Sequence, residues 1–257
     1  MSDDLFEILA WLDVARDDDE VVSALQGATA ELLLRYAIKS YGLTIYPLEL
    51  ESYYWRKDLF EDPYVHLNPL QQNRFGHFFI HRSGRSADSP YNRGLRACAS
   101  IVLSDTDDYY YSVLIRSAVF SDGVACFGPN NVLRHILSSL KVPEDQTEAF
   151  YRSVEERSVL FDLESASVLS GDLFATQMAT QLDPREKTPL VFAGRVGLGG
   201  RSPRFRNMPL RAVVGSLDKE HLYKDKRALL ARLRLLRKSS SCKGNKAAAS
   251  RRGRKSR

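Results

Sequence analysis

Two glutamates stand two positions apart in residues 48–53, whose sequence is Leu-Glu-Leu-Glu-Ser-Tyr. Apolar and polar residues alternate there, which predicts a strand with one buried face. Glu49 and Glu51 then point to the same face, roughly 6.6 Å apart from the rise of a strand. A carboxylate in a half-buried strand is either paired or held for chemistry, because an unpaired buried charge is costly.

Arg116 is a candidate ion-pair partner for these carboxylates. It lies within residues 111–119, a run of apolar and β-branched residues that predicts a strand. An arginine in such a strand requires an acceptor. We expect an ion pair with Glu49 or Glu51 on a neighbouring strand. The alternative is a functional role, in which Arg116 orients the carboxylate or binds phosphate.

Other patterns with chemical potential are weaker. His77 and His81 flank Phe-Phe-Ile in a predicted strand, which separates them by roughly 13 Å, too far to share a metal ion. Residues 197–200, Gly-Leu-Gly-Gly, lack the third glycine of a dinucleotide loop and precede residues 201–204, a poor helix start, so we interpret them as a turn. A glycosidase pair is disfavoured, because two same-face carboxylates of one strand do not flank a sugar bond from opposite sides.

Charge is distributed unevenly along the 257 residues. Residues 219–257 contain fifteen Lys or Arg and two acidic residues, whereas the first twenty residues contain eight acidic residues and one arginine. Positive charge placed at one end of a chain predicts a polyanionic partner for that end. Three distant cysteines predict reduced thiols and no zinc site. No stretch has the length of a membrane span, and no signal peptide is visible.

The order of predicted elements indicates an α+β fold. Two helices come first, at Asp4–Arg16 and at Glu20–Tyr41, the second closed by Gly42. Strands follow at about 43–55, 76–82, 96–103 and 109–119, then a helix at 131–140 after Gly-Pro, and strands at 191–198 and 210–214. We therefore expect N-terminal helices packed on a curved antiparallel sheet or partial barrel.

We divide the chain into three parts. Residues 1–218 form one globular domain, residues 219–238 a basic amphipathic helix, and residues 239–257 a disordered basic tail that is too polar to fold alone. The tail is expected to contact the backbone of a polyanionic partner through Lys243, Lys246, Arg251, Arg252, Arg254 and Lys255.

Several short segments, taken in order, resemble the alkyladenine (methylpurine, or 3-methyladenine) DNA glycosylase family. They cover about residues 30–215 and leave out the first helix and the basic tail. The segments are residues 49–53 (Glu-Leu-Glu-Ser-Tyr), 78–84, 113–118 (Val-Leu-Ile-Arg-Ser-Ala), 128–133 (Gly-Pro-Asn-Asn-Val-Leu), 194–199 (Gly-Arg-Val-Gly-Leu-Gly) and 209–211 (Pro-Leu-Arg).

The resemblance implies the family's α+β fold and a base-flipping mechanism. By position, Glu51 matches the carboxylate that activates water, Tyr53 the aromatic residue that stacks on the flipped base, and Arg116 the strand arginine near the carboxylate and the DNA backbone. These residue types suit the chemistry, because stacking holds a flipped base while a general base drives attack of water on the sugar. Neither a metal nor a cofactor is implied. The match also predicts that Glu51, rather than Glu49, faces an open cleft, and Glu49, His66 and Tyr91 are further pocket candidates.

The chain also departs from the family pattern. Ser83 stands where the family has a tyrosine wedge, and Ala99 or Ser100 stands near the family's pocket asparagine. His66 follows the carboxylate at a greater distance than the family's pocket histidine does. Three explanations remain open: a different substrate, substitution by Tyr91 or Tyr54, or loss of catalysis.

We therefore expect a DNA glycosylase-like protein that hydrolyses an N-glycosidic bond, with DNA as the main partner and RNA as a second candidate. The alternatives are a non-catalytic nucleic-acid-binding module and a protein-interaction domain with a solubilising tail. We expect the protein in the cytoplasm, at the nucleoid of a prokaryote or in the nucleus of a eukaryote, and not in a membrane.

Overall fold

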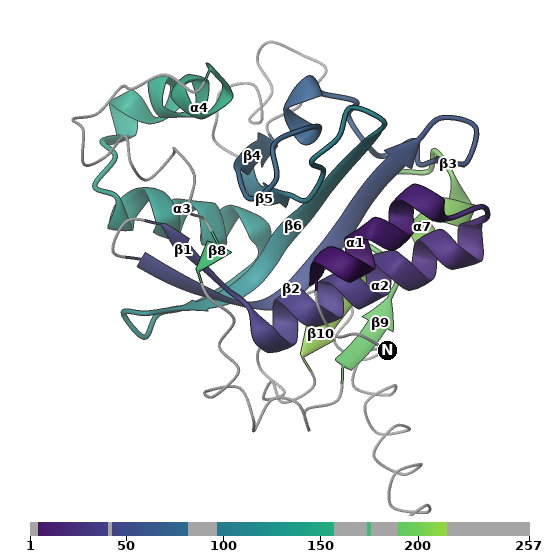
Figure 1. Ribbon diagram of the computed structural model, residues 1–257. Helices are drawn as coiled ribbons and strands as arrows, with labels where there is room; N and C mark the ends of the chain where they lie inside the picture. The colour runs from purple at the N-terminus through teal and green to yellow at the C-terminus, as the bar shows by residue number, and fades with distance from the viewer. Residues whose placement is uncertain (1–4, 41–42, 82–96, 157–173, 176–189, 215–257) are drawn as a thin grey trace, which may run out of the picture.

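A computed structural model describes residues 5–40, 43–81, 97–156, 174–175 and 190–214 (Figure 1). Its helices are α1 (Leu5–Val14), α2 (Asp18–Arg35), α3 (Pro129–Ser139), α4 (Thr147–Glu156) and α7 (Pro203–Asn207), with short 3-10 helices at Pro69–Gln71 and Glu144–Gln146. Its strands are β1 (Ala37–Ser40), β2 (Leu43–Arg56), β3 (Phe60–Glu61), β4 (Phe78–His81), β5 (Cys98–Val102), β6 (Tyr109–Phe120), β7 (Ala125–Phe127), β8 (Phe174–Ala175), β9 (Leu190–Ala193) and β10 (Arg211–Val214).

These strands form one open sheet with the order β4-β5-β6-β2-β1-β8, and every pairing between the described strands is antiparallel. Strand β2 is central, because β6 pairs with one edge along most of its length. The other edge of β2 is shared in turn by β1, β10 and β3. Residues 49–51 thus lie between β6 and β10, in the interior of the sheet.

Two register shifts interrupt the pairing of β2 with β6 near the glutamates. Glu49 stands opposite Ser117 and Leu50 opposite Ile115, so Arg116 has no directly facing partner. A β-bulge of this kind bends the strand and redirects the side chain of the extra residue. Here the bulge lies beside the two carboxylates with which the Arg116 side chain pairs.

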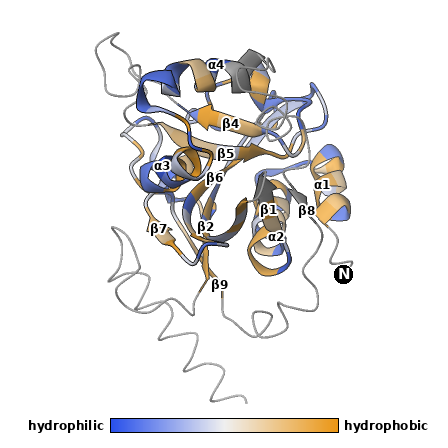
Figure 2. Cartoon of the chain, turned by 90° about the vertical axis from the view of Figure 1, so that its left-hand side faces the viewer, coloured by the Kyte–Doolittle hydropathy of each residue, from blue (hydrophilic) through white to orange (hydrophobic). Residues whose placement is uncertain are grey.

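The N-terminal helices cover the sheet across β2 and β10 (Figure 1). Asp17 caps α2 by accepting a hydrogen bond from the Glu20 amide. Leu5, Leu9 and Leu12 of α1 are buried, and they join one core with apolar residues of α2 and of the sheet. In Figure 2, β4 and β5 are mainly apolar, whereas α1 and α3 each have an apolar and a polar side.

The fold confirms the expected class: N-terminal helices with a mostly antiparallel open sheet. Three local predictions were wrong. Helix α2 ends at Arg35 instead of Tyr41, because Tyr36 is extended and β1 pairs with the start of β2. Strand β9 ends at Ala193 instead of Leu198. The segment at 48–53 has both faces buried, because helices cover one side and the other packs against further residues of the chain.

The interpretation of residues 201–204 was also wrong. Ser202 caps a short helix, α7, and Pro203 occupies its first turn. Serine before proline is a typical helix start. The serine oxygen accepts an amide hydrogen bond, and proline has no backbone N–H group that would be left unpaired in the first turn. The glycine-rich segment before it is irregular, as predicted, and Gly197 has a positive φ of 82°.

Candidate functional site

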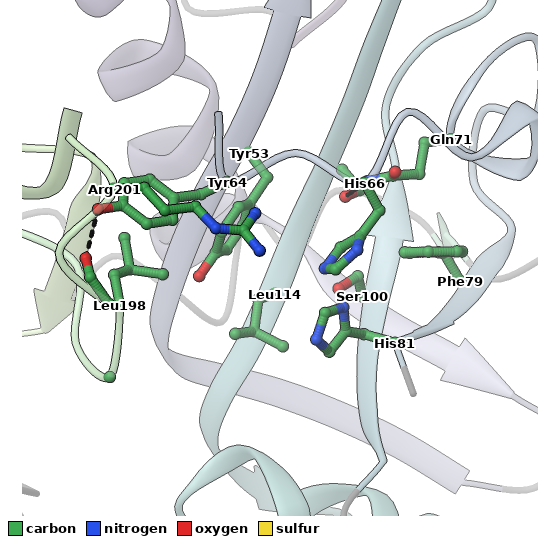
Figure 3. Close-up of a pocket in the computed structure, with 13 residues that line it drawn as sticks. Tyr53, Tyr64, His66, Gln71, Phe79, His81, Ser100, Leu114, Leu198 and Arg201 are labelled. Carbon is green, nitrogen blue, oxygen red and sulfur yellow. Dashed lines mark hydrogen bonds between the residues drawn. The ribbon is translucent and has the colours of Figure 1, made fainter. Parts of the chain in front are cut away.

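A cavity of about 370 Å³ opens on the face of the sheet to which Tyr53 points (Figure 3). It is formed by residues of β2, β4, β5 and β6, by the segment between β3 and β4, and by the glycine-rich turn before α7. The lining residues are Tyr53, Tyr64, His66, Gln71, Phe79, His81, Ser100, Ser112, Leu114, Gly197, Leu198, Gly199 and Arg201. This volume is near the lower end of the range typical of small-ligand pockets, about 300–1,000 Å³.

Beside the cavity lies a buried cluster of two glutamates and two arginines, which we call the carboxylate–arginine cluster: Glu49, Glu51, Arg116 and Arg211. Arg116 Nε lies 3.0 Å from Glu49 Oε1, and its Nη1 lies 3.3 Å from the Glu51 carboxylate. Arg211 Nε donates to Glu49 Oε1 at 2.6 Å. The predicted pairing of Arg116 with a strand carboxylate is therefore confirmed, and the two charges of each sign balance.

Glu51 itself does not reach the cavity surface. Its side chain is 0% exposed, and the residues that line the cavity do not include it. Its carboxylate accepts hydrogen bonds from the Val196 amide at 2.8 Å and from the Tyr53 hydroxyl at 3.1 Å. The expectation that Glu51 faces an open cleft was wrong, because pairing with Arg116 and closure by the segment at Val196 bury it. Burial raises the pKa of Glu51, and the Arg116 cation opposes that shift.

Tyr53 is the physical link between the carboxylate–arginine cluster and the cavity. Alternation along β2 places Tyr53 on the same face as Glu51, and its hydroxyl donates to Glu51 Oε2. Its ring lines the cavity. Burial, followed by the Glu51 charge, raises the pKa of Tyr53 well above its usual value, so the hydroxyl keeps its proton and acts as a donor.

A second buried ion pair packs against Tyr53 and Tyr64, which form the aromatic wall of the cavity. Arg195 and Asp62 are both 0% exposed, and their side chains meet at 2.5 Å. The Arg195 guanidinium lies 4.7 Å from the centre of the Tyr53 ring and 5.5 Å from that of Tyr64. It also donates to the Ser52 carbonyl at 3.1 Å. Arg195 therefore fixes both tyrosines to β2 and to the turn before α7.

Two histidines form the opposite side of the cavity. The rings of His66 and His81 lie 4.3 Å apart, and in Figure 3 both lie near Ser100. Burial lowers the pKa of both, and the Arg201 cation lowers that of His66 further. The pKa of His81 falls to about 4, so this ring is neutral at physiological pH.

Three neutral polar side chains line the cavity: Gln71, Ser100 and Ser112. Gln71 Nε2 donates to the Ser112 hydroxyl at 2.9 Å, which leaves the Ser112 proton to be donated elsewhere. The hydroxyl of Ser100, on the adjacent strand β5, makes no hydrogen bond within the described part of the chain. These two hydroxyls give the cavity uncommitted hydrogen-bonding capacity beside the apolar side chains of Phe79 and Leu114.

The glycine-rich turn is anchored by one hydroxyl. Tyr64 donates to the Gly199 carbonyl at 2.5 Å (Figure 3). The same hydroxyl accepts from the Ser202 amide at 3.0 Å. The φ of +82° at Gly197 favours glycine, whereas a Cβ added at Gly199 or Gly200 would meet no atom within 4 Å. Tyr64 thus fixes the cavity wall formed by residues 197–199 to the start of α7.

The structure brings together five of the twelve residues selected from the sequence. Glu49, Glu51 and Arg116 meet in the carboxylate–arginine cluster, whereas Tyr53 and His66 line the cavity. Tyr91 and all selected residues of the basic tail lie outside the described residues, as does the predicted helix at 219–238.

Sequence reasoning missed several residues: Arg195, Asp62, Arg211, Tyr64, Gln71, Ser112 and His81 as cavity or support residues. Two had a readable signal. Arg211 lies in an apolar strand, as Arg116 does, and therefore requires an acceptor. Arg195 lies two residues after the end of the β9 strand. The others have no short-range pattern, because contacts between distant segments place them.

Among the described residues, no group of three or more His, Cys, Asp or Glu side chains is arranged to hold a metal ion. None of the helices in the described ranges is long and apolar enough to span a membrane. No protein-family model matches the chain, and no curated protein matches its sequence.

Proposed function

We propose that the protein binds a nucleobase turned out of a nucleic acid, with DNA as the main substrate, and hydrolyses its N-glycosidic bond. The observation that carries the proposal is the hydrogen bond from Tyr53 to Glu51, which joins a ligand-sized cavity to a buried carboxylate. The aromatic rings of Tyr53, Tyr64 and Phe79 offer stacking surfaces, and the serine hydroxyls offer partners for the polar edge of a base.

The ordered segments that resemble alkyladenine DNA glycosylases support the same proposal. Glu51, Tyr53 and Arg116, which that resemblance selects, are mutual neighbours in the structure. The Val196 amide, from another of the matching segments, donates to Glu51. We extend the proposal to the fold, which we take as related to that of the glycosylases.

The buried position of Glu51 defines how the reaction would proceed. A water in the cavity attacks the anomeric carbon of the sugar as the carbon–nitrogen bond breaks. The water gives one proton to Tyr53 Oη while Tyr53 passes its own proton to Glu51 Oε2. The departing base keeps the bonding electron pair and takes up a proton from solvent, while Glu51 later returns its proton to solvent through Tyr53, so one water is consumed in total. Burial raises the pKa of Glu51, which makes its carboxylate a better proton acceptor than an ordinary glutamate.

One observation favours the second candidate, a non-catalytic base-binding module. Glu51 is fully buried and its hydrogen bonds are made by Arg116, Tyr53 and Val196, which is also what a purely structural carboxylate shows. In that case the cavity would bind a base without cleaving it, and the carboxylate–arginine cluster would only hold β2, β6 and β10 together.

Base release distinguishes the two candidates. The full chain is incubated with duplex and single-stranded oligonucleotides, DNA and RNA, that each carry one damaged or deaminated base, and free base is quantified. We expect release from at least one substrate. Glu51→Gln should abolish release and keep binding, because it removes only the proton acceptor.

Glu144→Gln, which changes an exposed carboxylate of the 3-10 helix at Glu144–Gln146, is the matched control and should act as the unaltered chain does. Binding without release from any substrate would instead establish the non-catalytic module.

A further inference from the structure

The charge around the cavity is asymmetric. Arg201 lines it and is exposed, and none of the described lining residues is acidic. The nearby carboxylates are buried behind the wall, each beside an arginine: Glu49 and Glu51 with Arg116, and Asp62 with Arg195. A ligand in the cavity therefore meets the positive charge of Arg201, whose guanidinium donates to the Pro63 carbonyl and pairs with no acidic side chain among the described residues.

The aromatic wall, Tyr53 and Tyr64, already carries a cation on the side away from the cavity. The face of an aromatic ring attracts cations, which suits a cavity that selects positively charged ligands. Here the Arg195 guanidinium already occupies the rear of Tyr53 and Tyr64, since it lies over both rings and is absent from the lining residues. A second cation stacked from the cavity side would face the first across a single ring.

The histidine side gives no compensating attraction. His66 and His81 are neutral at physiological pH, because their pKa values are lowered, and protonation would only add positive charge. In Figure 3 the Arg201 side chain extends from the glycine-rich turn toward the space between Tyr53 and His66. A base stacked on Tyr53 would lie beside this guanidinium.

We infer that the cavity selects uncharged bases and discriminates against bases that carry a positive charge, with Arg201 as the residue that determines this specificity. The identification of the ligand as a base rests on the proposed function. The inference adds its charge class, and it concerns binding alone, independent of whether the bond is cleaved.

An isosteric pair of nucleosides tests the inference. N7-methyladenosine carries a fixed positive charge, whereas its analogue with carbon in place of N7 has the same shape and no charge. Dissociation constants for both are measured by calorimetry with the full chain at neutral pH and low salt. We expect the neutral nucleoside to bind at least about tenfold more tightly, which corresponds to about 1.4 kcal/mol.

Two arginine variants locate the effect. Arg201→Gln should reduce the preference for the neutral nucleoside at least about threefold. Arg206→Gln, which removes an exposed arginine of α7 outside the cavity, changes the net charge equally and should leave the ratio unchanged. A ratio that Arg201→Gln leaves intact would overturn the assignment to Arg201.

The outcomes separate this inference from the proposed function. Equal or tighter binding of the charged nucleoside overturns the inference and leaves the base-binding cavity in place. Binding of neither nucleoside overturns both. Selective binding of the neutral nucleoside without base release from any oligonucleotide supports the inference and rejects the hydrolytic activity.

Discussion

The carboxylate–arginine cluster and the cavity lie on the same face of the sheet, but they use polar residues in opposite ways. In the cluster, Glu49 and Glu51 are buried, and their carboxylates accept hydrogen bonds from arginine, amide and hydroxyl donors. In the cavity, Ser100 and Ser112 keep hydrogen-bonding capacity that the described protein groups do not use.

The difference shows that the residues with the strongest chemical signature are not those that meet a ligand. Buried charges must be paired to be tolerated, so the main role of the cluster is to hold the strands of the sheet together. Neutral groups contact the ligand instead, because leaving them without a protein partner costs little free energy where the cavity has access to water. Among the described residues, Tyr53 connects the two regions, since its ring lines the cavity and its hydroxyl donates to Glu51.

The largest expected effect comes from breaking the cluster. Arg116→Leu leaves Glu51 without its cation and Glu49 with Arg211 alone. We expect the free energy of unfolding to fall by roughly 3–5 kcal/mol, the usual cost of an uncompensated buried charge. Urea denaturation measures it. Arg152→Leu, which breaks the exposed pair with Glu148, is the control and should cost about 0–1 kcal/mol. Similar urea midpoints for both variants would mean that the cluster is not a stabilising unit.

The histidine side of the cavity should respond to pH. His81 has a pKa of about 4 in the folded state and an ordinary value near 6.5 when unfolded. The unfolded chain therefore binds more protons between these values, so stability is full above pH 6.5 and is lost as the pH falls toward 4. Linkage gives a loss of about 2 kcal/mol between pH 7 and pH 5 from this residue.

His81→Gln should remove that part of the pH dependence, whereas His135→Gln on α3, outside the cavity, should retain it. Urea denaturation at pH 7 and pH 5 for the three chains provides the comparison, in which contributions from Glu51 and other groups cancel. If His81→Gln keeps the whole acid-dependent loss, His81 is not buried as a neutral ring.

The smallest effect concerns the glycine-rich turn. Tyr64→Phe removes the hydroxyl that bonds the Gly199 carbonyl and the Ser202 amide, and should cost about 1–2 kcal/mol of stability. It should also weaken nucleoside binding, because residues 197–199 form part of the cavity wall. Tyr110→Phe is the control, since the Tyr110 hydroxyl makes no hydrogen bond among the described residues. Equal stability of the two variants would show that this anchor is dispensable.

Much of the sheet was predictable, because long strands such as β2 and β6 carry strong local patterns of apolar and β-branched residues. The Arg116 ion pair was predictable for a related reason: an arginine among apolar strand residues must find an acceptor. What failed was the degree of burial of Glu51. Alternation gives the face of a side chain, but not whether another segment, here the one at Val196, closes over it.

The cavity could not be assembled from the sequence. Its lining combines residues from four strands with the segment at Tyr64–Gln71 and the turn at 197–201, and no local period connects these. The β-bulge at Arg116 is equally invisible, because it arises from the register between two strands. Tyr53 was selected only through the resemblance to glycosylases, whereas its link to Glu51 is a finding of the structure.

Single-turnover base release by Tyr53→Phe tests the central claim, that the Tyr53 hydroxyl couples the cavity to Glu51. On the substrate identified for the unaltered chain, we predict a rate constant about 10²–10⁴-fold lower, with nucleic-acid binding changed less than about threefold. Tyr53→Phe combined with Glu51→Gln should be no slower than either single variant, because the two residues act as one unit. An unchanged rate for Tyr53→Phe would contradict the account.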